Sequence, residues 1–94
     1  MNLPIEITDR AYLEILNIFK NKNIPQNYSL RVGVRGSGCS GVSQYLGFDQ
    51  KNERDEVYSL GEIEVLIEKK DFMHLIGMKI DFVSNEEASG FVFL

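Results

Sequence analysis

The spacing of apolar residues predicts one long helix near the start of the chain. Between Asp9 and about Asn21, apolar side chains recur at intervals of three and four residues, which is the spacing of one helical face. The members of this face are Ala11, Tyr12, Ile15, Leu16 and Phe19. Thr8 supplies a side-chain oxygen suited to capping the helix start. Pro25 lies in the segment that ends the helix, because proline cannot continue one.

After Tyr28 the apolar period shortens to two residues, which predicts strands. Residues 28–35 alternate, with Arg31 and Arg35 on the face opposite the apolar side chains. Further strands are expected at 42–49, 57–60, 63–67, 79–83 and 91–94, with Leu46 and Phe48 pointing inward. Residues 49–55 and the charges up to Glu56 read as a solvated loop. Residues 70–76 suit a short helix closed by a glycine.

These elements predict a single α+β, strand-rich domain over residues 1–94. Consecutive strands are joined by short loops, which favours antiparallel pairing. We therefore expect a compact sandwich or partial barrel of about six mostly antiparallel strands, with an N-terminal helix and a short late helix.

Composition and charge exclude several classes of function. The formal net charge is −4, and the ten Lys and Arg residues are scattered, so a nucleic-acid-binding stripe is absent. No apolar run approaches the roughly 18–20 residues that span a bilayer. The start of the chain lacks the basic and apolar regions of a secretory signal, so we expect a cytoplasmic protein. The single cysteine excludes an intrachain disulfide.

The cysteine, Cys39, lies in the run GSGCSG at residues 36–41, which has two interpretations. The run matches the G-x-G-x-x-G pattern of dinucleotide-binding proteins, but that site needs a helix to follow it. Residues 42–48 alternate like a strand, so we reject this interpretation. A glycine-rich loop that displays the thiol remains, as does a small buried cysteine in a tight turn.

Residues 30–41, LRVGVRGSGCSG, resemble the signature of the A-type iron–sulfur carriers, the HesB/IscA family. The similarity extends to residues 5–9 before the first helix, to residues 45–49, and to the closing segments 80–83 and 90–93. The resemblance implies a compact strand-rich fold and a role in carrying iron or an iron–sulfur cluster to apoproteins.

In that family three cysteines hold the metal: one in the glycine loop and two in a C-terminal Cys-Gly-Cys tail. Cys39 matches the first, and the other two have no counterpart among the 94 residues. A small cluster is typically held by four thiolates. We therefore expect iron or a cluster to bind through Cys39 in a homo-oligomer, or with an external thiol or client protein completing the ligand set. The alternative is a metal-free interaction module, and a redox-active thiol is a third interpretation.

Other candidate residues have more ordinary interpretations. Arg35 could lower the thiol pKa of Cys39, but an ion pair with a surface carboxylate is the simpler expectation. His74 would have to lie beside Cys39 to form a catalytic pair, so we expect a partly exposed helix residue and no enzyme. The pair Glu86 and Glu87 reads as solvated loop. Residues 91 and 93, both phenylalanine, read as core or sheet-edge packing or as a surface that a subunit partner covers.

Overall fold

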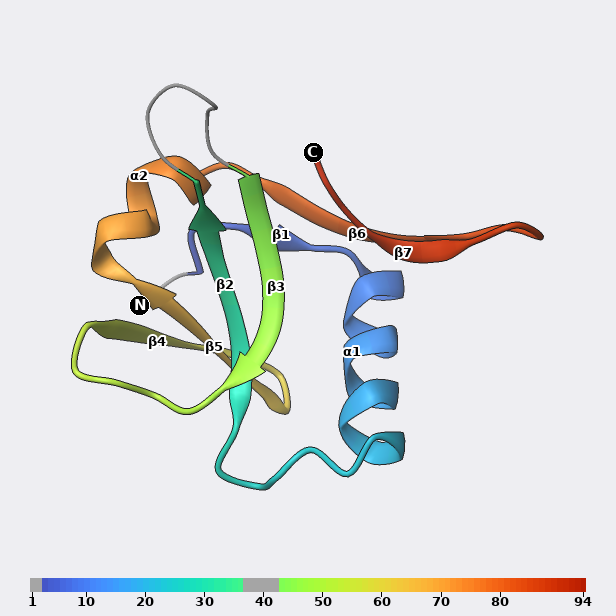
Figure 1. Cartoon of the computed structure of the whole chain (residues 1–94), viewed down its shortest axis with the longest axis horizontal. Helices are drawn as coiled ribbons and strands as arrows, with labels where there is room; N and C mark the ends of the chain where they lie inside the picture. The colour runs from blue at the N-terminus through green and yellow to red at the C-terminus, as the bar shows by residue number, and fades with distance from the viewer. Residues whose placement is uncertain (1–2, 37–42) are drawn as a thin grey trace.

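The computed structural model describes residues 3–36 and 43–94, which form two β-sheets and a long helix (Figure 1). The strands are β1 (Glu6–Ile7), β2 (Ser29–Arg35), β3 (Ser43–Asp49), β4 (Asp55–Leu60), β5 (Ile63–Glu68), β6 (Lys79–Ser84) and β7 (Ser89–Phe93). The helices are α1 (Asp9–Asn21) and the short α2 (Phe72–Leu75), which follows a 3₁₀ turn at Lys69–Asp71. The predicted α+β, strand-rich class is confirmed.

One sheet has four strands in the order β3-β2-β5-β4, and the other has three in the order β1-β6-β7. Three of the pairings, β2–β3, β4–β5 and β6–β7, are antiparallel. The β2–β5 and β1–β6 pairings are parallel. The antiparallel hairpins were predicted from their short loops, whereas β1 was not, because two residues are too few to show a period.

The helix α1 begins and ends where its apolar face predicted. The Thr8 hydroxyl oxygen accepts a hydrogen bond from the Ala11 N–H at 3.2 Å, so Thr8 is the N-cap. Ala11 and Ile15 are fully buried against the sheets. The amphipathic pattern therefore positions the helix as well as predicting it. Neither described helix is both long and apolar enough to cross a membrane.

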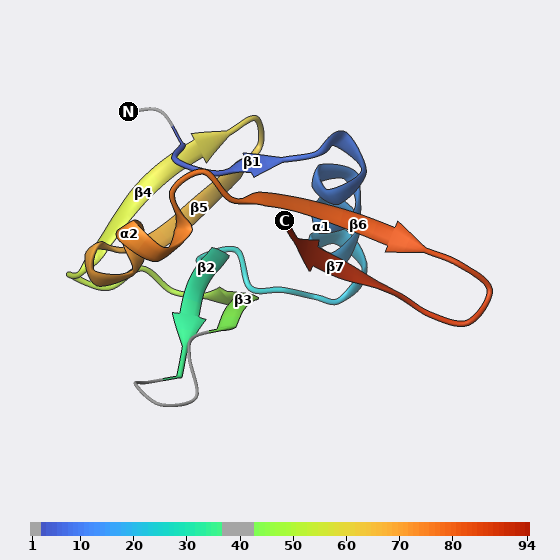
Figure 2. The same ribbon diagram turned by 90° about the horizontal axis from the view of Figure 1, so that it is seen from above.

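The core lies where the two sheets and α1 meet, as the view from above shows (Figure 2). Ile15 of α1, Val32 and Val65 of the four-stranded sheet, and Ile80 of the other sheet are all without exposed surface. Leu46 and Phe48 of β3 are partly buried and pack against this core, as predicted. Burying this apolar surface is the main force that joins the elements.

The expectation of a solvated loop over residues 49–56 is wrong for Asp55. Its carboxylate is fully buried and accepts two hydrogen bonds from the Arg31 guanidinium, at 2.6 and 2.7 Å. Burial alone would raise the pKa of Asp55, but the hydrogen bonds from Arg31 and from the Asn52 N–H hold it below its usual value. Asp55 in turn raises the pKa of Arg31. Arg31 of β2 thus reaches Asp55 of β4, the strand beyond β5 in the same sheet.

Candidate functional site

Cys39 follows β2 and precedes β3 in the sequence, and it lies outside the described residues together with the rest of 37–42. The register of the two strands nevertheless fixes which residues connect them. Arg35 is opposite Ser43 in the last pair, so the connection between the two strands, called the cysteine loop below, comprises the seven residues 36–42, and Cys39 is the middle one. A strand follows the loop, which confirms that the dinucleotide interpretation fails.

The first residue of the loop has a backbone conformation that requires glycine. Gly36 has φ = 104°, in the region that side chains with a Cβ rarely adopt. The chain therefore leaves β2 in a direction that other residues would resist. This is a local reason for one of the glycines that precede Cys39, and it is independent of any nucleotide.

A tyrosine and an arginine contact each other on one face of the β2–β3 hairpin, near the end at which the loop begins. Tyr45 is opposite Gly33 in the register, and its ring occupies the space that a side chain at Gly33 would need: a Cβ there would lie 2.8 Å from Cε1 of the ring. The Arg35 guanidinium carbon lies 4.3 Å from the centre of the same ring, a cation–π contact. The described partner of Arg35 is therefore an aromatic ring and not the expected surface carboxylate.

A buried carboxylate contacts the backbone near the end of β2. Asp71, in the turn before α2, is only 4% exposed, and its Oδ2 is 3.4 Å from the Val34 N–H. Its Oδ1 accepts a hydrogen bond from the Lys70 ammonium at 3.2 Å. Asp71 could not be predicted from the sequence, since it lies 37 positions from Val34 and nothing in its local pattern indicates burial.

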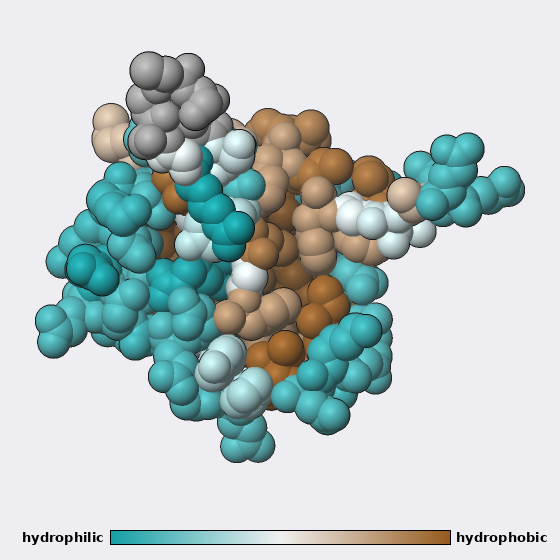
Figure 3. Space-filling view, in the orientation of Figure 1, coloured by the Kyte–Doolittle hydropathy of each residue, from teal (hydrophilic) through white to brown (hydrophobic). Residues whose placement is uncertain are grey.

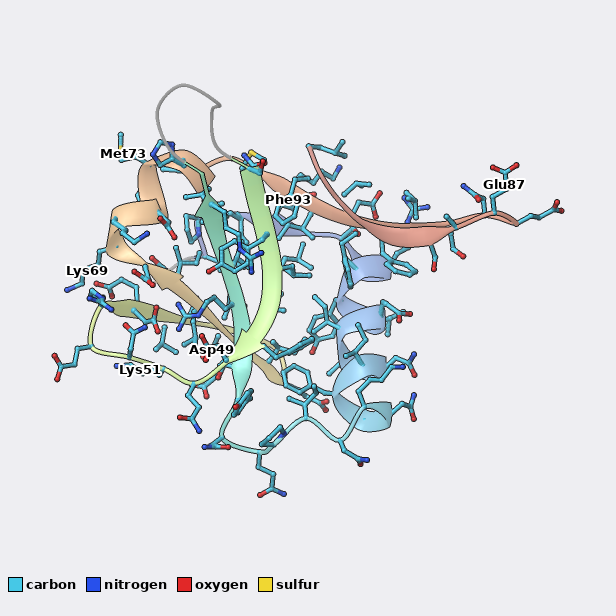
Figure 4. All side chains as sticks on the ribbon, viewed as in Figure 1. Asp49, Lys51, Lys69, Met73, Glu87 and Phe93 are labelled. Atoms are coloured by element: carbon cyan, nitrogen blue, oxygen red, sulfur yellow. The ribbon has the colours of Figure 1, made fainter. Side chains whose placement is uncertain are left out.

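Other predicted candidates lie on different parts of the molecule. His74 is exposed on α2, the helix that contacts β2. The predicted partner of its ring, Cys39, lies outside the described residues. Glu86 and Glu87 are exposed at the tip of the β6–β7 hairpin, at the opposite end of the molecule from Met73 of α2 (Figure 4). The acidic pair is thus remote from α2, which lies against the β2 end of the loop.

The described residues contain no separate metal centre. Within 3–36 and 43–94, no three His, Asp or Glu side chains gather closely enough to hold a metal ion. The buried acids have protein partners: Asp55 binds Arg31, Asp71 binds Lys70, and Asp81 binds Arg10.

Two sequence comparisons point to one family. Residues 3–93 match the family described as iron-sulphur cluster biosynthesis. The chain is 38% identical over 92 residues to an uncharacterized SufA protein of Bacillus subtilis, covering 97% of this chain and 76% of that one. It is 35% identical over 92 residues to the iron-binding protein IscA of Xenorhabdus nematophila, covering 97% and 84% of the two chains.

Solved structures agree on the fold. Escherichia coli SufA superposes with a TM-score of 0.79 at 20% identity, covering 96% of this chain and 78% of that one. A structure of IscA with its [2Fe-2S] cluster gives a TM-score of 0.71 at 19% identity, covering 96% and 80%. At such identities the likeness concerns the fold, and the two-sheet arrangement described above is that of these proteins.

Proposed function

The chain belongs to the iron–sulphur cluster biosynthesis family, and we propose that it binds iron or an iron–sulphur cluster through Cys39, between subunits, and delivers it to apoproteins. The A-type carriers of this family are non-catalytic. The observation that carries the proposal is the cysteine segment at residues 30–41, whose only thiol is the middle residue of a hairpin loop.

The base of the loop supports a binding role because it is built from well-held groups. Gly36 sets the direction of the chain, Tyr45 and Arg35 contact each other on one face of the hairpin, and Asp71 lies against the Val34 N–H. A ligand on a loop is positioned best when the strands and side chains beneath it are fixed.

One thiol per chain sets the stoichiometry of the proposal. A small cluster usually takes four thiolates, so a dimer supplies half and an external thiol or a client cysteine supplies the rest. Ligands that come partly from outside can be exchanged, which suits cargo that must leave. A free thiolate needs a reducing compartment, which is consistent with a cytoplasmic protein.

Anaerobic reconstitution with ferrous iron and sulfide, followed by desalting, tests the proposal. We expect the wild-type chain, with added glutathione, to retain iron and show visible absorption, and Cys39→Ser to retain neither above background. Ser40→Ala is the matched control, since it alters the same loop and keeps the thiol. Equal retention by wild type and Cys39→Ser, or no retention by either, would contradict the proposal.

The second candidate function is a metal-free interaction module. It is favoured by the presence of one cysteine where the resembled family uses three, and by the absence of a carboxylate or histidine cluster among the described residues. This function predicts a folded chain that binds an assembly protein equally well with Ser at position 39. Pull-down with both variants, beside the reconstitution, separates the two functions.

A further inference from the structure

Strand β7 is an edge strand with an open side. It pairs with β6 alone among the described strands, and the β6–β7 hairpin projects from the body of the molecule (Figures 1 and 2). An edge strand presents a row of backbone donors and acceptors that another strand can pair with. The open side of β7 is therefore a surface with which a further strand can pair.

The ladder between β6 and β7 identifies the backbone groups that face outward. Lys79 and Leu94 exchange both N–H···O bonds, at 3.0 and 2.7 Å. In an antiparallel ladder the hydrogen-bonded pairs alternate with non-bonded ones. The non-bonded positions in β7 are therefore Ser89, Phe91 and Phe93, and their N–H and C=O groups point away from β6.

The edge carries none of the protection that natural sheets place there. Protein edges are usually blunted by charged residues, proline or bulges. The β7 sequence, SGFVF, has no charge and no proline, whereas the edge strands β3 and β4 carry Asp49 and Glu56. Leu94, the next residue, is 66% exposed. An apolar band also runs from this end of β7 down between β3 and α1 (Figure 3).

We propose that β7 pairs antiparallel with β7 of a second copy of this chain, about a two-fold axis at Phe91. The outward-facing residues are spaced evenly on either side of Phe91. That axis therefore places Phe91 opposite its own copy and Ser89 opposite Phe93 of the partner subunit, and each outward donor meets an outward acceptor. The two three-stranded sheets become one sheet of six strands.

The positions of the acidic residues favour antiparallel pairing of the two β7 strands over parallel pairing. The tip of each hairpin carries Glu86 and Glu87, which are exposed. Antiparallel pairing separates the two acidic tips to opposite ends of the joint sheet, whereas parallel pairing would place them side by side. The tip would instead lie about two strand spacings, roughly 10 Å, from the row that holds the partner subunit's Lys79.

The aromatic side chains on the same edge favour a second copy of this chain as the partner. Phe91 and Phe93 are half-buried, and Phe91 packs edge-on against Phe82 with the ring centres 5.0 Å apart. In the proposed pairing, Phe91 of one copy meets Phe91 of the other across the strands, a type of pair that stabilises sheets. Pairing over so few residues makes a small interface, so we expect a weak dimer whose population depends on concentration.

Sedimentation velocity on the metal-free Cys39→Ser chain tests the inference, since it needs neither iron nor thiol and so fails or succeeds separately from the proposed function. Over concentrations up to about 1 mM, we expect a monomer–dimer equilibrium. Ser89→Pro removes one outward donor from each copy without touching the β6 ladder, so it should raise the dissociation constant at least about tenfold. Ser89→Ala, the matched control, should leave it unchanged.

Amide hydrogen exchange locates the interface independently of any substitution. The amides of Ser89, Phe91 and Phe93 should exchange more slowly as the concentration rises, while the exposed amides at Glu86 and Glu87 should not change. A chain that stays monomeric throughout overturns the inference. So does a dimer that Ser89→Pro leaves intact or that protects none of these three amides.

Discussion

Arg31 and Arg35 lie on the same face of β2, yet their surroundings assign them different roles. Arg31 is 4% exposed and binds Asp55 through two hydrogen bonds. Arg35 is exposed and lies over Tyr45 at the base of the cysteine loop. A charge enclosed with its partner is a structural group, whereas a charge at a surface loop remains able to act on a thiolate or a ligand.

Replacing Asp55 or Asp49, the two aspartates that accept hydrogen bonds from Arg31, should have very different consequences. Asp55→Asn removes the fully buried carboxylate that binds the Arg31 guanidinium and leaves only the exposed Asp49 and the more distant Glu68 beside that charge. We therefore expect a loss of about 3 kcal/mol in the free energy of unfolding. Asp49 has a side chain that is 57% exposed and makes one bond to Arg31 at 3.0 Å. Asp49→Asn should therefore cost less than about 1 kcal/mol. Urea unfolding of both variants measures the difference, and equal losses would contradict the assignment.

The sequence predicts which face of β2 Arg31 occupies but not that its side chain is buried. Alternation tells which side chains point together and carries no information about what packs on them. Asp55 lies 24 positions further along the chain, in a segment whose polar composition is typical of a loop. Burial of Arg31 therefore depends on the pairing of β2 with β5 and of β5 with β4, which is tertiary information.

At the scale of elements, the β2–β3 hairpin joins sequence pattern to the proposed site. Two glycines lie in its strands, and the structure gives them opposite surroundings. A Cβ on Gly33 would lie 2.8 Å from the Tyr45 ring, whereas a Cβ on Gly47 would meet nothing within 4 Å. Gly33 is thus required by a close contact, and Gly47 is not.

Alanine substitutions at the two glycines should have opposite effects on stability. Gly33→Ala pushes the Tyr45 ring outward, so we expect a loss of about 1–3 kcal/mol and a weakened Arg35–Tyr45 contact. Gly47→Ala should be neutral or stabilising by about 0.4–1 kcal/mol, because it restricts the unfolded chain without a clash. Urea midpoints measure the change in stability of both variants, and the NMR shifts of the Tyr45 ring measure its displacement in Gly33→Ala. An unmoved ring in Gly33→Ala would refute the close-contact explanation.

Elements with a clear period were predictable, and the supports of the loop were not. The helix α1 and the strands β2 to β7 follow from apolar spacing, and the cysteine segment drew attention to Cys39. Asp71 reaches the Val34 N–H only because α2 packs against β2. Tyr45 reaches Arg35 only because of the hairpin register. Both contacts cross between elements, so no local pattern indicates them.

At the scale of the whole molecule, Asp81 joins the start of α1 to the three-stranded sheet. Its Oδ1 accepts hydrogen bonds from the Thr8 hydroxyl at 2.6 Å and from Arg10 Nε at 3.2 Å. The Phe82 N–H also donates to it, at 2.8 Å. Thr8 is at the same time the N-cap of α1, so one carboxylate links the helix cap, the first helical turn and β6.

This linkage predicts how the fold responds to acid. The hydrogen bonds from Arg10 and then Thr8 lower the pKa of Asp81 from 3.8 to about 2. A carboxylate whose pKa is lower in the folded state stabilises the fold above its unfolded pKa, and that contribution disappears as the pH falls through the folded pKa. The part of the stability due to Asp81 should therefore be complete above about pH 4 and lost between about pH 4 and pH 2.

Urea unfolding at a series of pH values, for wild type, Asp81→Asn and Glu86→Gln, tests this response. Asp81→Asn should be less stable than wild type at neutral pH, and its deficit should shrink as the pH falls toward 2, since the wild type then loses the same interaction. Asp55, whose pKa is also lowered, is present in all three chains, so its acid response cancels in the comparison. Glu86→Gln removes an exposed charge at the hairpin tip and should follow the wild-type profile. A deficit in Asp81→Asn that stays constant from neutral pH to pH 2 would show that its cost comes from packing and not from the charge that ties α1 to β6.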